Sequence, residues 1–248
     1  MLDLFADMTQ RKAARIAGFM YLGLIVFGII SQVTRMSFIE PDDATQTANN
    51  IMANPGKFEA ANVVWLFSEM FLLLLGLALY VVLKPVNQIL AKLMVLFIVV
   101  GVAIESLNTL NNFAAVQYLS GAEYLSVFSQ EQLNANAMYH LELWDTGYAI
   151  AAIMSFGPWL VPAGYLWYQS GYVPKILGIL AMLAGIGIFM EGILHFAPDS
   201  EGIALPFSLI AVIGEFAVCG WLIIMGVKIP EMKEQDETPA EMTEAESE

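Results

Sequence analysis

The sequence predicts an all-α polytopic membrane protein, a bundle of six transmembrane helices with both ends of the chain in the cytoplasm. Of its 248 residues, 58% are apolar and 14% are charged, whereas soluble domains average about 45 to 50% apolar and about 25% charged residues. Successive apolar runs are each long enough to cross a hydrocarbon core about 30 Å thick as a helix. Continuous runs argue against a transmembrane β-barrel, whose strands alternate over segments of about ten residues. The lipid bilayer is therefore the first expected partner.

The predicted spans form one transmembrane domain over residues 13–227. The third and fourth exceed the thickness of a membrane, which predicts tilt or extension beyond the lipid. Pro158 and Pro162 predict a kink in the fourth span, because proline lacks the N–H that a helix needs. Gly178, Gly185 and Gly187 predict close approach of the fifth span to a neighbour. The predicted bounds are 13–35, 60–83, 90–116, 138–167, 174–197 and 204–227.

Basic residues in the short loops and at the ends of these spans predict the orientation. Arg35 and Lys57 lie on one side, and the other eight basic residues lie on the opposite side. The positive-inside rule places the larger set in the cytoplasm, together with residues 1–12. We therefore expect a multi-pass protein of a bacterial inner (plasma) membrane, whose first span is not cleaved as a signal peptide. The eight are Arg11, Lys12, Arg15, Lys84, Lys92, Lys175, Lys228 and Lys233.

The segments outside the spans carry most of the remaining predictions. Eight of the 24 acids follow Lys228, so residues 228–248 predict an acidic, disordered cytoplasmic tail. In the first outer loop, Asp42 or Asp43 can cap a short helix that ends near Asn54. In the second, the run GAEYLSVFSQEQLNANAMYH predicts a helix in the membrane interface.

Polar residues inside the spans are the candidates for function, because a charge near the membrane centre costs at least about 2.5 kcal/mol. Three of them in the third span are spaced i, i+3 and i+7, and therefore share one helix face. Acidic or histidine pairs in the fourth and fifth spans also share faces. The candidates for substrate binding or proton relay are Glu69, Glu105, Asn108, Asn112, Glu142, Asp145, Glu191, His195 and Glu215.

Several of these candidates fall at similar depth near the outside, which predicts a polar cavity open to the outer solution. Two of the candidates, Glu69 and Glu215, lie nearer mid-span. The predicted cavity is formed by Glu105, Asn108, Glu142, Asp145, Glu191 and His195.

Three functions remain open at this point. The first is binding or movement of a small solute or proton, since carboxyl groups in a membrane can change protonation as a substrate moves. The second is a structural or stress-response component, whose buried polar side chains only join helices. The third is a metal-dependent intramembrane enzyme with His195, Glu191 and Glu142 as ligands. No H-E-x-x-H pattern supports the third, and haem ligation by His140 and His195 is less favoured still.

Absent features narrow the functional classes further. No lysine or arginine lies at the centre of a predicted span, which excludes a retinal Schiff base and leaves the acids without a basic partner. Burying such acids is costly unless protons or water accompany them. Cys219 is the single cysteine, and no phosphate loop, nucleophile elbow or dinucleotide fingerprint occurs. We therefore expect no cofactor and no nucleic-acid partner, favour a non-enzymatic protein, and leave homo-oligomerisation open.

The run FGPWLVPAGYLWYQSGYVPKILGILAMLAGIG, residues 156–187, resembles a bacterial multi-spanning membrane protein family called domain of unknown function 4386. The resemblance rests on a Tyr-x-Ser-Gly turn at 168–171, followed by Pro174, Lys175, Leu177 and Gly178. Residues 10–32, 83–91 and 214–227 also resemble the family. The resemblance implies several membrane helices and no established activity.

At single positions, the resemblance implies both agreement and departure. Acids are expected in relatives at the positions of Glu142, Glu191 and Glu215. A basic residue that relatives carry in the third span is replaced near Ile98, and a histidine that relatives carry near Trp144 is missing here. The departures weaken the transfer of any polar site from the family.

Overall fold

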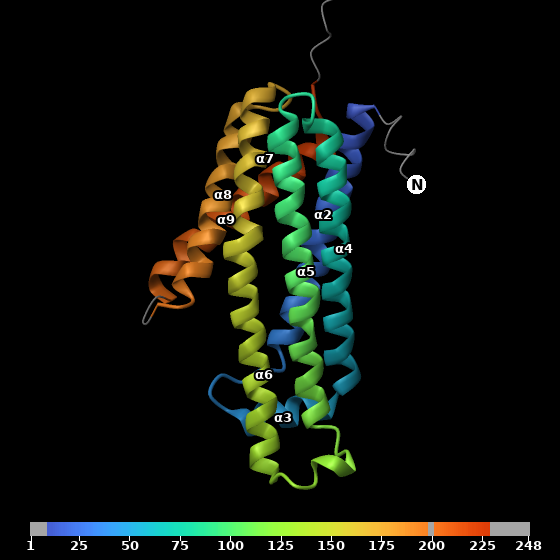
Figure 1. Cartoon of the computed structure of the whole chain (residues 1–248), viewed down its shortest axis with the longest axis vertical. Coiled ribbons are helices and arrows are strands. Elements are labelled where there is room, and N and C mark those ends of the chain that lie inside the picture. Colours follow the sequence, from blue (N-terminus) through green and yellow to red (C-terminus); the bar gives the residue numbers. More distant parts are fainter. Residues whose placement is uncertain (1–8, 198–200, 229–248) are drawn as a thin grey trace, which may run out of the picture.

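The computed structural model describes residues 9–197 and 201–228, without the side chains of 201–205. Helices dominate the described residues, and six of them are long and apolar enough to cross a membrane, which confirms the predicted fold class (Figure 1). The predicted acidic tail from residue 229 and the first eight residues lie outside the described part.

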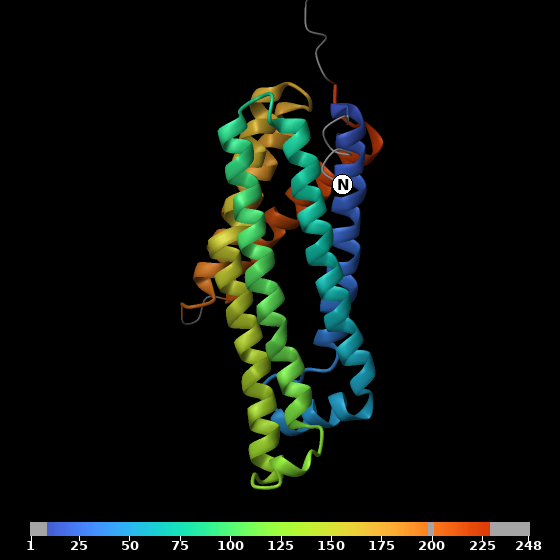
Figure 2. The same cartoon turned by 45° about the vertical axis from the view of Figure 1, so that its right-hand side comes forward.

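The first half of the chain forms three long helices and one short one. Helix α2 covers Gln10–Met36, α3 covers Ala44–Ala53, α4 covers Pro55–Leu83 and α5 covers Gln88–Tyr118. Helix α2 packs on α4, and α4 packs on α5. The short α3 lies across one end of the bundle (Figures 1 and 2), where it contacts α6 and α4.

The second half begins with one long, irregular span. A short 3₁₀ turn, η1, at Glu123–Leu125 precedes α6 at Gln130–Ala151, a π-helical segment η2 at Ala152–Phe156 and α7 at Gly157–Ser170. The π-helical segment ends before both prolines, so it is a distortion that the sequence did not predict, and the kink at Pro158 and Pro162 stays a prediction.

The last two helices form a hairpin against this long span. Helix α8 covers Lys175–Leu194 and α9 covers Glu201–Ile224. Helix α8 packs on α7 and α9, and α9 returns to α2. The hairpin stops well short of α3 (Figure 1).

Two ends of the bundle are distinguished by charge. The basic end, where α2 begins, α4 joins α5 and α7 joins α8, carries seven cations: Arg11, Lys12, Arg15, Lys84, Lys92, Lys175 and Lys228. The far end carries α3. Helix α8 has 20 residues, or about 30 Å at 1.5 Å per residue, which matches a hydrocarbon core. Helices α4 and α5, with 29 and 31 residues, therefore extend beyond α8 at the far end.

Two helices, α4 and α6, start five or more residues before the predicted position. Helix α4 begins at Pro55 because Asn54 caps it and proline suits the first helical turn. Helix α6 begins at Gln130 because Ser129 and Gln132 form a capping box. Residues 130–137 therefore extend the predicted fourth span, and the prediction of a separate interfacial helix in the second loop was wrong. The first-loop helix is confirmed as α3, with Asp43 accepting from the backbone N–H of Gln46 at 2.8 Å.

The turn between α7 and α8 explains the Tyr-x-Ser-Gly pattern. Gly171 ends α7 at φ 66°, a left-handed conformation that favours glycine. The Ser170 hydroxyl donates to the carbonyl of Trp167 at 2.9 Å and accepts from the N–H of Tyr172 at 3.0 Å. Pro174 then precedes the first residue of α8. Proline suits this position because the N–H groups at the start of a helix have no partner within the helix.

Helices α7 and α8 cross through two reciprocal glycine contacts. A Cβ at Gly178 would lie 2.6 Å from the carbonyl oxygen of Gly164, and a Cβ at Gly164 would lie 2.6 Å from that of Gly178. Gly157 and Gly185 face each other in the same way, at the same distances. The predicted role of Gly178 and Gly185 in close helix approach is confirmed.

We predict that Gly178→Ala destabilises the protein by about 1–3 kcal/mol, because α8 must move away from α7. Unfolding of the detergent-solubilised protein by sodium dodecyl sulfate, followed by circular dichroism, measures this loss. Gly28→Ala in α2 is the matched control, since nothing lies within 4 Å of its added Cβ. Equal stability of the two variants would disprove the close crossing.

Candidate functional site

A buried polar layer separates two apolar cores. The larger core fills the basic end and includes Leu79, Ile98 and Trp167; the smaller core fills the far end and includes Ile51 and Phe58. Between them, helices α2, α4, α5 and α6 each contribute buried polar or amphipathic side chains. We call this set the polar layer: Arg35, Asn62, Trp65, Glu69, Glu105, Asn108, Asn112 and Trp144.

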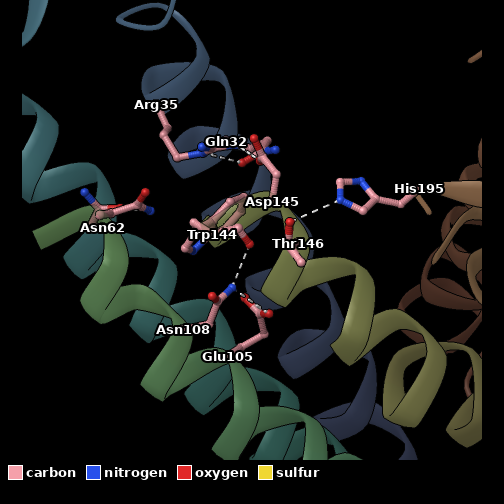
Figure 3. A network of polar contacts seen from close by, with 10 residues as sticks. Gln32, Arg35, Asn62, Glu105, Asn108, Trp144, Asp145, Thr146 and His195 are labelled. Carbon is pink, nitrogen blue, oxygen red and sulfur yellow. Dashed lines mark hydrogen bonds and ion pairs between the residues drawn. The ribbon is translucent and has the colours of Figure 1, made fainter. Parts of the chain in front are cut away.

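Helix α5 supplies the centre of the polar layer. Glu105, Asn108 and Asn112 are 0%, 8% and 1% exposed, so they share a buried face, as their spacing predicts. Asn108 Nδ2 donates to Glu105 Oε1 at 3.2 Å and to the backbone oxygen of Trp144 in α6 at 2.8 Å (Figure 3). Asn108 therefore joins α5 directly to α6.

The same face of α5 also joins α4. Asn112 Nδ2 donates to Asn62 Oδ1 at 2.7 Å, and Asn62 Nδ2 donates to the carbonyl of Phe58 at 2.9 Å. Trp65 and Glu69 follow Asn62 by three and seven residues, so they lie on the same face of α4 as Asn62. Glu69 is 3% exposed.

Arg35 changes the electrostatic picture drawn from the sequence. It lies in the last turn of α2, is 4% exposed, and its Nη2 is 2.7 Å from Asp145 Oδ1 in α6 (Figure 3). Its guanidinium carbon lies 3.9 Å from the centre of the Trp144 ring, a cation–π contact. Arg35 was predicted as the last residue of the first span, on the outer side, and not as a site residue, whereas α2 continues to Met36 and Arg35 is buried. Asp145 has a basic partner after all.

Three aromatic rings line the layer beside Arg35. The Trp65 and Trp144 rings meet edge to face at 5.5 Å, and Tyr148 stacks on Trp144 at 5.8 Å. Trp65 Nε1 and Glu105 Oε2 are both buried without a hydrogen-bonding partner in the described chain.

The other predicted residues lie at the edge of the layer or outside it. Glu142 is exposed on α6, Glu191 is half-buried on α8, and exposed His195 Nε2 lies 3.4 Å from the Thr146 hydroxyl (Figure 3). Glu215 lies nearer the basic end, where its Oε1 accepts from the Tyr21 hydroxyl at 3.2 Å.

The candidate metal ligands are not gathered by the fold. Within residues 9–197 and 201–228, no three His, Cys, Asp or Glu side chains are grouped as a metal site requires. His140 Nδ1 lies 3.1 Å from Asn111 Oδ1, and its ring stacks on Tyr118 at 5.4 Å. His140 and His195 thus contact different residues.

Sequence reasoning missed Arg35, Asn62 and Trp65 as site residues. Asn62 and Glu69 are seven residues apart in one span, and this spacing could have predicted a shared polar face. Little in the sequence indicates that Arg35 is buried, because it follows the last apolar residues of its span and resembles a loop residue. Only the folded structure, in which the Arg35 side chain reaches Trp144 and Asp145 of α6, shows that it is buried.

We predict that Gly147→Ala costs about 1–3 kcal/mol by displacing Asn108 from the Trp144 carbonyl. A Cβ at Gly147 would overlap Asn108 Oδ1. In an Asn108→Ala background, the same Gly147→Ala change should cost much less, since the obstructing side chain is gone. Detergent unfolding of the four proteins in this cycle measures the coupling, and additive effects would contradict the contact.

We also predict that Asp145→Asn destabilises the protein more than Arg35→Met. Asp145 is 48% exposed, so its carboxylate stays hydrated when Arg35 is removed. Arg35 is buried, and in Asp145→Asn its charge has no carboxylate partner. Because Asp145 is half exposed and therefore screened by solvent, the expected loss of stability is at most a few kcal/mol. Unfolding in sodium dodecyl sulfate compares the two variants, and the reverse order would contradict the burial of Arg35.

Comparisons with known proteins place the chain in a family without a known activity. Residues 16–226 match the sequence model described as domain of unknown function (DUF4386). An uncharacterized protein of Archaeoglobus fulgidus is 31% identical over 157 residues, which cover 63% of this chain and 78% of that protein. No solved structure matches. The family match extends from the first span to the last, as the resemblance of the separate motifs predicts, and the chain therefore belongs to the family of domain of unknown function 4386.

Proposed function

We propose that this protein binds a small polar solute or protons in the polar layer and exchanges them with the outer solution beside Asp145. The single observation that carries the proposal is a set of buried polar atoms without a hydrogen-bonding partner in the described chain. They belong to four helices and all lie in the polar layer: Arg35 Nη1, Trp65 Nε1, Glu69 Oε2, Glu105 Oε2, Asn112 Oδ1 and Trp144 Nε1.

Such atoms destabilise the folded protein, because each buried polar group without a partner costs about 1–3 kcal/mol. Three of them are donors and three are acceptors, a combination that a hydrogen-bonding solute or a short water chain can satisfy. The atoms therefore support a site for a polar guest.

The two acids narrow the chemistry of that guest. Neither Glu69 nor Glu105 forms an ion pair within the described part of the chain. A carboxylate in an apolar surrounding is stable only with a proton, a cation or water beside it. Loss or gain of a proton at Glu69 or Glu105 is therefore the expected companion of binding.

The route to solution is at the Arg35–Asp145 pair. Arg35 contacts the buried Trp144 ring on one side, and Asp145 is 48% exposed on the other. This pair thus connects the buried layer to the surface near the end of α8, where His195 and Thr146 also lie. By the positive-inside rule, that surface faces the outside of the cell.

A structural role is the second candidate, and the interhelical hydrogen bonds favour it. The bonds from Asn108 to the Trp144 carbonyl, from Asn112 to Asn62 and from Ser31 to the Ala61 carbonyl each join two helices. Such bonds fix helix packing in a membrane. They do not, however, satisfy the partnerless atoms of the layer.

We predict that Glu69→Gln and Glu105→Gln each abolish pH-linked proton uptake by protein in liposomes, because a glutamine side chain cannot carry the proton. A pH-sensitive dye trapped inside the vesicles reports the flux after a pH step. Glu142→Gln is the matched control, an exposed acid on α6 outside the layer, and should leave the flux unchanged.

The same variants distinguish the two candidates. Both Gln variants should fold, because glutamine retains the size of glutamate and both neutral states suit burial. Wild-type flux in Glu69→Gln and Glu105→Gln would refute the proton role, and altered unfolding without any flux in the wild type would favour the structural one.

A further inference from the structure

We infer that the acidic segment, residues 231–248, docks in a basic pocket formed where α2 begins and α9 ends. The pocket has a volume of about 460 Å³ and is lined by Arg11, Lys12, Arg15, Met225, Gly226 and Lys228, among others. Four of these residues are cations from two ends of the described chain that are far apart in sequence. The inference is independent of the proposed function.

The cations of the pocket are not neutralised by the part of the chain that the structure describes. The helix ends at the basic end, residues 9–16, 80–92, 166–178 and 222–228, contain no Asp or Glu. In the described residues, the single ion pair joins Arg35 to Asp145, outside the basic end. The pocket therefore has an excess of positive charge.

Helix geometry increases that excess. Arg11 and Lys12 lie in the first turn of α2, which contains no acid. The start of a helix carries a partial positive charge, so cations there raise the potential, while an anion would be stabilised by about 0.3–1 kcal/mol. An acidic ligand is the expected complement of this pocket.

The acidic segment is the occupant that the chain itself supplies. It carries eight acids and one lysine, and its first acid, Glu231, follows Lys228 by three residues. Three extended residues span about 10–11 Å, so the segment starts within reach of the pocket wall. A tethered partner has an effective concentration in the millimolar range, which favours it over free anions.

Zero-length carbodiimide cross-linking tests the docking in the full-length protein, purified in a neutral mild detergent. Peptide mass spectrometry then locates the amides. We expect Lys12 to link to carboxyls of residues 231–248 about tenfold more than Lys175, a lysine at the basic end outside the pocket. Raising the salt to about 0.5 M should remove the difference, because exposed charges are then screened within a few Å.

A charge variant tests the role of the pocket without removing the reporter amine. Arg11→Gln with Arg15→Gln should reduce the Lys12 links about fivefold or more, whereas Lys84→Gln, at the basic end but outside the pocket, should leave them unchanged. Equal linking of Lys12 and Lys175, or linking of Lys12 to Asp3 or Asp7 instead, would overturn the inference. If the Lys12 links were lost in nanodiscs of phosphatidylglycerol but kept in nanodiscs of phosphatidylcholine, anionic lipid headgroups would be the occupant of the pocket, and the inference would be overturned.

Discussion

The hydrogen bond from Asn108 to the Trp144 carbonyl is the contact on which the arrangement of the polar layer depends. It holds α5 against α6 at 2.8 Å, and Gly147 leaves room for the Asn108 side chain. This approach places the Trp144 ring between Arg35 and Trp65. Asp145, the next residue, then reaches Arg35 from the surface. The contact therefore positions a buried cation, an aromatic cluster and an exposed acid together.

The two apolar cores give this layer its chemical character. At the basic end, glycine pairs bring α7 against α8, and large side chains such as Leu166 and Trp167 are fully enclosed. At the far end, a smaller core forms under α3. Water has little access from either direction through such packing. Exchange with solution is therefore expected sideways, at Asp145, where the layer meets the surface.

The sequence predicted those features that depend on one helix and missed those that depend on two. The length and apolarity of the spans, and the shared face of Glu105, Asn108 and Asn112, follow from local periodicity. The burial of Arg35 and the exposure of Glu142 depend on how α2 and α6 pack, and no spacing within one helix contains that information. The start of α6 was missed because its first two turns are polar, which resembles a loop beyond the membrane.

Glu215 and Glu69 show why the polar layer is more than a set of packing bonds. Both acids lie within spans and neither forms an ion pair in the described chain. Glu215 nevertheless accepts from the Tyr21 hydroxyl, so one hydrogen bond joins α9 to α2 and stabilises their packing. Glu69 Oε2 is buried without any such partner, and three further helices contribute atoms in the same condition. A layer that served packing alone would gain stability by replacing such atoms with apolar ones, so their concentration in one layer is better explained by a polar guest.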